Sequence, residues 1–251
     1  LGALRHERIA ACGQARMPTK RRRRDQDSAS GGVGMRSAIK ATEAARLIPD
    51  GARLMIGGFL AVGTPERVID ALVARGARGL TVIANDTARP GTGIGKLIDA
   101  GCVARVVASH IGTNPATQRK MLEGEIEVEL VPQGTLAERI RAGGAGLGGV
   151  LTPTGVGTVV AEGKRVIELD GREYLLEPPL RADFALIRAH EADYFFNLTY
   201  RLAAANFNPV MALAAECVIA EPDEIVPLGA IPPDAVRTSG ALVHHLVERR
   251  H

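Results

Sequence analysis

Two side chains stand where a nucleophile or a general acid–base could act. Glu216 is the lone acid at the end of the apolar helical segment 211–215, so on residue type alone it is the best candidate nucleophile. His110 follows the apolar strand pattern of 105–109 and could serve as an acid or a base. A histidine in that setting is more often packed and hydrogen-bonded, and we favour this structural interpretation of His110.

The spacing of cysteines and histidines does not support metal or disulfide chemistry. Cys12, Cys102 and Cys217 are far apart and form no CxxC pair, which favours reduced thiols in a cytoplasmic protein. His244 and His245 are neighbours, and adjacent residues on a strand point to opposite faces. The sequence therefore predicts no metal site.

Two glycine-rich stretches differ in what their surroundings allow. Gly57 and Gly58 follow a short apolar strand, at the edge where open α/β sheets bind ligands, and glycine lets backbone N–H groups approach an anion. A tight turn is the alternative explanation. Residues 144–149 match G-x-G-x-x-G, but a helix precedes them and Pro153 follows, so we read them as a mobile loop and not as a dinucleotide site.

Four strand–helix units would position these candidates. A helix is expected at 38–47, and each unit after it combines a short apolar run, a turn and apolar residues at helical spacing. The expected strands are 53–56, 80–84, 104–109 and 126–131; the expected helices run from Pro65 to Gly76, over 94–100, from Pro115, and over 135–142. Such a series favours a parallel sheet covered on both faces.

Local signals mark the ends of these elements. Thr64 and Asn114 are predicted helix N-caps, and Thr135 with Glu138 has the spacing of a capping box. Turns are expected after two of the strands, at 85–86 and 132–134.

The pattern changes after residue 143. Residues 166–169 and 173–176 flank an Asp-Gly pair and predict a β-hairpin, and strands at 184–188 and 218–226 enclose a helix near 209–216. The predicted fold is a three-layer α/β domain over 35–251. It has an open, mostly parallel sheet with helices on both faces and a β-hairpin insertion.

The basic charge of the chain comes from one segment. The net charge is +3, but residues 1–34 carry eight basic and three acidic side chains, so the remainder is slightly acidic. We interpret 1–34 as a disordered basic leader, with Met35 as an alternative start of the native chain, and we expect no nucleic-acid binding by the folded part. A nucleic-acid-binding tail at 21–24 is the alternative. No apolar run reaches the roughly 18–20 residues of a membrane helix.

Several segments together resemble one enzyme family. Residues 50–65, DGARLMIGGFLAVGTP, resemble the signature of family I CoA-transferase alpha subunits: a short apolar strand, Gly-Gly-Phe and Gly-x-Pro at fixed spacing. Further segments that resemble the family are 83–87, 109–115, 131–146, 152–158 and 205–209. The Tyr194-Phe195-Phe196 run departs from the family pattern.

The resemblance implies a ping-pong transfer of CoA between a short-chain acyl-CoA and a carboxylic acid, of the acetate/acetoacetate or succinate/3-oxoacid type. In that family a glutamate in a Ser-Glu-Asn-Gly motif of the beta subunit attacks the thioester. This chain contains no Glu-Asn-Gly, so we expect a cytoplasmic alpha subunit, active only with its beta subunit in an α2β2 complex. CoA and acyl-CoA are substrates, and no permanent cofactor is expected. A non-catalytic ligand-binding or regulatory protein of the same fold is the alternative.

The resemblance also implies which residues contact the substrates. Gln133 and Asn85 would donate hydrogen bonds to the tetrahedral oxyanion, because neutral amides can stabilise that charge without acting as nucleophiles. The alternative for Gln133 is a turn residue that bonds its own backbone. The residues implied to shape the acyl or pantetheine pocket are Gly57, Gly58, Phe59 and Gly63.

Overall fold

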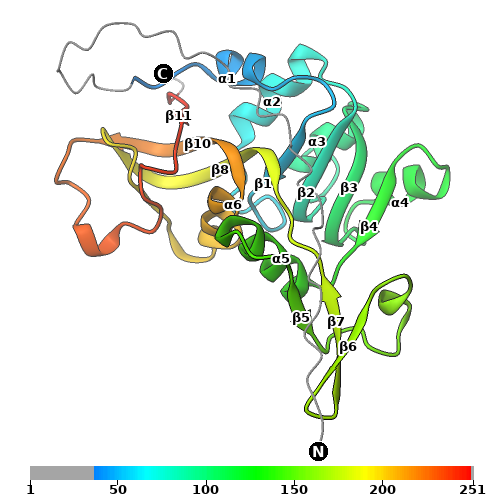
Figure 1. The fold of residues 1–251 in the computed structure, drawn as a ribbon. Helices are drawn as coiled ribbons and strands as arrows, with labels where there is room; N and C mark the ends of the chain where they lie inside the picture. The colour runs from blue at the N-terminus through cyan, green and yellow to red at the C-terminus, as the bar shows by residue number, and fades with distance from the viewer. Residues whose placement is uncertain (1–36, 250–251) are drawn as a thin grey trace, which may run out of the picture. The chain divides into compact units, whose positions relative to one another are not determined.

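The computed structural model describes residues 37–249 of the 251-residue chain (Figure 1). The expectations for residues 1–34, a basic leader and a start at Met35, lie outside the described residues. No helix in the described range has the length and apolar character needed to cross a membrane.

The main element is an open, mostly parallel sheet, as predicted. The strand order is β11-β10-β8-β1-β2-β3-β4, all in parallel pairs, and β9 pairs antiparallel with β8. The strands are β1 (Arg53–Ile56), β2 (Leu80–Asp86), β3 (Val103–His110), β4 (Glu127–Leu130), β8 (Ala182–Asp193), β9 (Leu198–Thr199), β10 (Ala215–Val226) and β11 (His245–Leu246). The chain order reverses at β1, which has β2 on one side and β8 on the other.

Helices cover both faces of this sheet and confirm the three-layer prediction (Figure 1). The helices are α1 (Ala41–Leu47), α2 (Glu66–Arg75), α3 (Ile94–Asp99), α4 (Pro115–Leu122), α5 (Gln133–Ala145) and α6 (Asn208–Leu213). Side chains alternate between faces along a strand. Leu54 and Ile56 therefore pack in the core that α1, α2 and α3 share, whereas Met55 packs in the core of α5 and α6.

The predicted hairpin is confirmed and belongs to a small second sheet. Strands β6 (Val166–Leu169) and β7 (Arg172–Glu177) are joined through Asp170 and Gly171, both with positive φ, as a two-residue hairpin turn requires. A further strand, β5 (Val150–Thr152), pairs antiparallel with β7, and this sheet projects from the main one (Figure 1). Single 3₁₀ turns lie at η1 (Val159–Ala161), η2 (Leu202–Ala205) and η3 (Pro233–Ala235).

Several predicted boundaries were wrong. Helix α1 begins at Ala41 and not at residue 38, because Ile39 bridges to Val247 instead. The turn predicted at 85–86 is the end of strand β2, since Asp86 pairs with His110 of β3.

Helix starts show the same kind of error. Helix α5 begins at Gln133, so the turn predicted at 132–134 and the cap at Thr135 are both wrong; Pro132 holds the N-cap position and Thr135 is buried. Thr64 does not cap α2, whose N-cap position is held by Pro65. The predicted cap at Asn114 is confirmed: its side chain accepts from two backbone N–H groups of α4.

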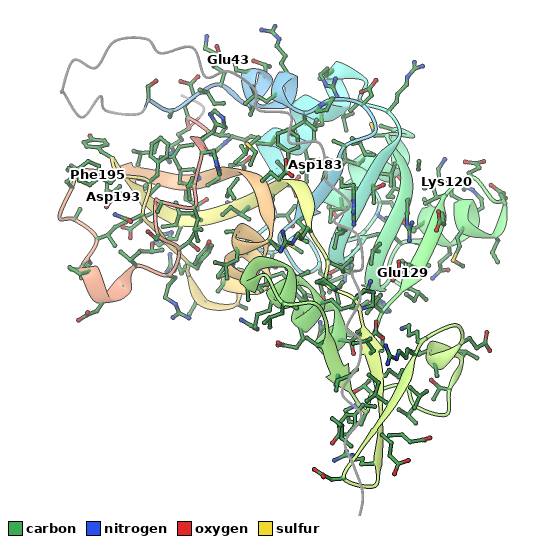
Figure 2. All side chains as sticks on the ribbon, viewed as in Figure 1. Glu43, Lys120, Glu129, Asp183, Asp193 and Phe195 are labelled. Carbon is green, nitrogen blue, oxygen red and sulfur yellow. The ribbon has the colours of Figure 1, made fainter. Side chains whose placement is uncertain are left out.

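The Tyr194-Phe195-Phe196 run forms the turn between β8 and β9. Asp193 and Phe195 lie at this turn (Figure 2). Asp193 accepts hydrogen bonds there from the backbone N–H of Phe195 and of Asn197, both at 2.9 Å. Phe196 is buried with a φ of 71°, whereas Tyr194 and Phe195 are exposed.

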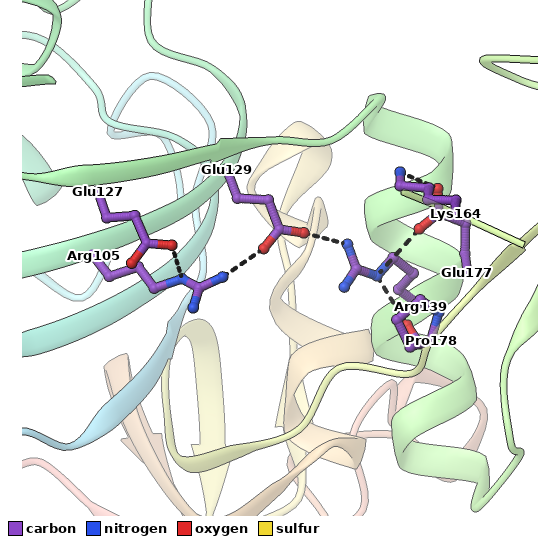
Figure 3. A network of polar contacts seen from close by, with 7 residues as sticks. All are labelled: Arg105, Glu127, Glu129, Arg139, Lys164, Glu177 and Pro178. Carbon is purple, nitrogen blue, oxygen red and sulfur yellow. Dashed lines mark hydrogen bonds and ion pairs between the residues drawn. The ribbon is translucent and has the colours of Figure 1, made fainter. Parts of the chain in front are cut away.

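A buried arginine joins α5 to both sheets (Figure 3). Arg139 donates to Glu129 of β4 at 2.7 Å and to the carbonyl oxygen of Pro178, just after β7, at 2.9 Å. Its Nε also lies 3.8 Å from Glu177, a fully buried carboxylate that accepts from Lys164 at 2.6 Å. Helix α5 is therefore fixed at mid-length to the main sheet and to the small one.

Replacing Arg139 should destabilise the fold strongly. In Arg139→Leu the buried Glu177 keeps Lys164 alone, and breaking a buried ion pair leaves a charge poorly compensated, so we expect a loss of about 3 kcal/mol in the free energy of unfolding. Urea unfolding of the purified protein measures this. The control is Arg119→Leu, whose surface pair with Glu123 should contribute less than about 1 kcal/mol. Equal losses would contradict a structural role for the network.

Glu129 should make stability depend on pH at the acid side. Burial alone would raise the pKa of Glu129, but hydrogen bonds and charges of Arg139 and Arg105 outweigh burial and lower the pKa below 4.5. Such a group stabilises the folded state above its unfolded pKa, and this contribution is lost as the pH falls through the lowered folded pKa.

Below about pH 4.5 we therefore expect the free energy of unfolding to fall less steeply in Glu129→Gln than in the unmodified protein. Urea unfolding at a series of pH values measures both slopes. Identical slopes would show that Glu129 titrates alike in both states.

Candidate functional site

One cavity of about 460 Å³ lies where the carboxyl ends of the central strands meet. Its lining residues come from the segment after β1 (Phe59), the end of β2 (Asn85), helix α5 (Gln133, Ala137, Arg141), the segment into and through α6 (Asn206, Phe207, Pro209, Val210, Leu213) and the loop after η3 (Arg237, Thr238, Ser239, Leu242). Ligands bind at this edge of open α/β sheets, next to the strand where the chain order reverses. Here that strand is β1.

Two of the expected donor residues meet in this cavity. Asn85 is the penultimate residue of the buried strand β2 and is 1% exposed, while Gln133 is the exposed first residue of α5. The Gln133 Nε2 atom donates to Asn85 Oδ1 at 2.7 Å. Ser109 of β3 reaches the same residue, with its Oγ 2.7 Å from the Asn85 backbone oxygen and 3.1 Å from Asn85 Oδ1. The side-chain amides of Asn85 and Gln133 are thus hydrogen-bonded to each other in the cavity.

Of the four residues implied to shape the pocket, Phe59 lines the cavity directly. The three glycines lie behind it and let two loops approach each other. A side-chain carbon at Gly57 would collide with the Asn208 amide, and one at Gly58, where φ is 122°, would collide with the Thr64 hydroxyl. The backbone at Gly63 meets Ala204 in the same way. A direct contact of these glycines with substrate stays a prediction.

Gly57, Gly58 and Gly63 form a glycine wall behind the cavity. Two asparagines hold this wall together, and neither was singled out from the sequence. Asn206 accepts hydrogen bonds from the backbone N–H of Gly58 at 3.0 Å and donates to the Val62 oxygen at 3.0 Å. Asn208 is fully buried and donates to the Gly63 oxygen at 2.9 Å. Both lie in segment 205–209, and the resemblance of this segment to the family was the sequence signal that could have found them.

The charge of the cavity is positive. Its lining includes Arg141 and Arg237 and no aspartate or glutamate. Both carboxylate oxygens of Glu138 accept from Arg141 Nε, at 3.1 and 3.2 Å, whereas the structure shows no ion pair for Arg237 within the described residues. An anionic ligand such as a carboxylate fits this environment.

The other candidates lie elsewhere. His110 is exposed, so the expectation of a packed histidine was wrong. Glu216 is exposed at the start of β10, the opposite edge of the sheet from the cavity. His244 accepts a hydrogen bond from the backbone N–H of Val218 through its Nδ1 atom. Burial, and to a smaller extent the charge of His244, lowers the pKa of His245. No cluster of metal-ligating side chains occurs among residues 37–249.

The glycine stretch at 144–149 is only partly a loop. Gly144 and Ala145 belong to α5, and Gly146 ends the helix with a φ of 73° in the left-handed C-cap position. Gly144 packs directly on Leu213 of α6, where a side chain would collide. Gly144 therefore serves helix packing and Gly146 helix capping, and the mobile-loop interpretation does not hold for 144–146.

Comparison with known proteins agrees with this architecture. The sequence model of the coenzyme A transferase family matches residues 38–249. The chain is 60% identical over 198 residues to the acetate CoA-transferase subunit alpha of Escherichia coli K12, covering 79% of this chain and 90% of that one. It is 51% identical over 199 residues to the acetoacetyl-CoA:acetate/butyrate CoA transferase alpha subunit of Clostridium acetobutylicum, covering 79% and 91%.

A solved structure shows the same fold. The acyl-CoA transferase of Escherichia coli O157:H7, in a thioester complex with CoA, superposes with a TM-score of 0.76 at 26% identity. The match covers 83% of this chain and 46% of that longer chain, so the chain spans about half of that enzyme's length. With the family match extending over nearly all of the described residues, this chain belongs to the coenzyme A transferase family.

Proposed function

We propose that this chain is the alpha subunit of a heteromeric CoA-transferase that moves CoA between a short-chain acyl-CoA and a carboxylic acid. The observation that carries the proposal is the Gln133–Asn85 amide pair in a positively charged cavity that has no carboxylate of its own. We place the enzyme in the cytoplasm, where scattered free cysteines stay reduced.

Gln133 is suited to stabilise an oxyanion. Each step that forms or breaks the anhydride and thioester passes through a tetrahedral intermediate whose oxygen gains negative charge, and a fixed neutral donor lowers its free energy. One N–H of Gln133 is held by Asn85, which leaves the second for a ligand. Gln133 also opens the 13-residue helix α5, whose N-terminus no side chain caps, so the helix dipole favours negative charge nearby.

The nucleophile must come from another chain. The cavity lining contains no acid, and the family resemblance puts the attacking glutamate on a beta subunit. Large apolar side chains lie exposed beside the cavity: Phe59 at 46%, Val62 at 53% and Leu213 at 46%. Such a patch fits a protein partner. We therefore propose that the beta subunit covers this edge, in an α2β2 complex, and brings its glutamate to Gln133.

Gln133→Ala should lower kcat about 100-fold or more, because it removes one preorganised oxyanion donor. The assay is CoA transfer from acetoacetyl-CoA to acetate or succinate by the chain mixed with its beta subunit. The control is Gln118→Ala on α4, whose amide lies 3.5 Å from a backbone oxygen outside the cavity and should leave kcat unchanged.

Two results would count against this function. Activity of the chain alone would contradict the missing nucleophile. A mixture that assembles yet transfers no CoA from several short acyl-CoAs would favour a ligand-binding protein of the same fold.

Arg237→Gln should raise KM for the substrates by about 10-fold without a comparable fall in kcat, because it removes a charge-assisted contact made to the bound anion throughout the reaction. Steady-state kinetics of the complex measure both constants. Arg119→Gln on α4, outside the cavity, is the matched control. An unchanged KM would show that Arg237 does not contact the substrate.

A further inference from the structure

Asp86 is a buried carboxylate next to the amide pair and has no role in the proposed function so far. It is 3% exposed and ends strand β2. Its Oδ2 accepts from Asn85 Nδ2 and from the Leu60 backbone N–H, both at 3.0 Å, and its Oδ1 accepts from the Ala88 N–H at 2.6 Å. No cation pairs with it within the described residues, so neutral N–H groups stabilise its charge.

The Asp86 carboxylate fixes the direction of the hydrogen bonds that run from Asp86 through Asn85 to Gln133. A carboxylate can only accept hydrogen bonds, so the amide group of Asn85 must turn its nitrogen toward Asp86. The Asn85 oxygen then faces Gln133, and Gln133 must present its nitrogen to that oxygen, as the 2.7 Å contact shows. Because this series of hydrogen bonds starts at a group that can only accept, its donors and acceptors can be arranged in one direction only. That direction determines where the remaining N–H of Gln133 points.

Asp86 also holds strained backbone beside the cavity. Leu60 and Ala88, its two backbone donors, have positive φ values of 49° and 55°, which residues other than glycine rarely adopt. Leu60 adjoins Phe59, which lines the cavity. Strain of this kind persists only where surrounding contacts enforce it, and it gathers at functional sites.

We propose that Asp86 is a positioning residue of the transfer reaction. Its carboxylate sets the polarity of the Asp86–Asn85–Gln133 chain and so directs the Gln133 N–H to the oxyanion. This inference rests on the proposed function. In Asp86→Asn the new amide can donate as well as accept, so both polarities become accessible and Gln133 loses its fixed orientation.

The test is a double-mutant cycle in the complex with the beta subunit. Asp86→Asn should lower kcat about 10-fold and change KM for the acyl-CoA by less than about twofold, because it affects the transition state only. In a Gln133→Ala background the same substitution should change kcat by less than about twofold, since its effect passes through Gln133. Melting temperature and complex formation are measured for every variant.

A matched control separates positioning from a general effect on the fold. Asp193 is another buried carboxylate, and like Asp86 it accepts from two backbone N–H groups and one asparagine side chain: the N–H of Phe195, the N–H of Asn197 and the Asn197 amide. It has no hydrogen bond to Asn85 or Gln133. Any effect of Asp193→Asn on kcat should therefore be the same with and without Gln133.

If Asp86→Asn does not fold, Asn85→Ala takes its place in the test. It interrupts the Asp86–Asn85–Gln133 series of hydrogen bonds and leaves the hydrogen bonds from backbone N–H groups to Asp86 in place. Its loss in kcat should likewise be non-additive with Gln133→Ala. The inference would be overturned if the loss in kcat of Asp86→Asn, or of Asn85→Ala in its place, were additive with that of Gln133→Ala. It would also be overturned if that loss were no larger than the loss caused by Asp193→Asn. Neither result would contradict the transferase function. An unmodified complex that transfers no CoA would overturn both.

Discussion

The parallel register of the central strands is the constraint on which the rest of the site depends. Parallel strands end at one edge, so residues far apart in the sequence meet there without a long-range signal of their own. Asn85 and Gln133 are 48 positions apart and still form a 2.7 Å hydrogen bond. A shift of β2 by one residue would turn Asn85 to the other face of the sheet and remove that contact.

Helix α5 converts this edge into a defined geometry. Its first residue, Gln133, enters the cavity, and Arg139, six positions later, anchors the helix to β4 and to the segment after β7. A side chain at the free end of a helix can be placed accurately only if the helix itself cannot slide or rotate. The buried charges of the network therefore contribute precision as well as stability, at a point remote from the cavity.

Much of the architecture could be predicted from the sequence, because apolar periodicity and glycine stops are local signals. Strand β1 and hairpin strand β6 occur at the predicted residues. The errors lie where a tertiary partner decided the outcome. Asp86 was expected in a turn, yet strand β3 extends β2 through it. Asn85 and Gln133 were found through family resemblance. Asp86, Asn206 and Asn208 also lie in resembling segments, but their roles depend on contacts with the distant backbones of Leu60, Gly58 and Gly63, which local periodicity does not reveal.

The glycine wall has an evolutionary consequence. At Gly57 and Gly58 the backbone touches the side chains of Asn208 and Thr64, and at Gly63 it touches the backbone of Ala204, with no space for an added carbon. Almost any substitution there therefore displaces the wall behind the cavity. Substitutions at these three positions therefore offer no gradual route to a cavity of another shape. A change in the shape of the cavity falls more easily on the segment at 237–242, where Arg237 and Ser239 are exposed and line the cavity. A rigid wall beside an adjustable segment would let one scaffold diversify without rebuilding the sheet edge that carries both.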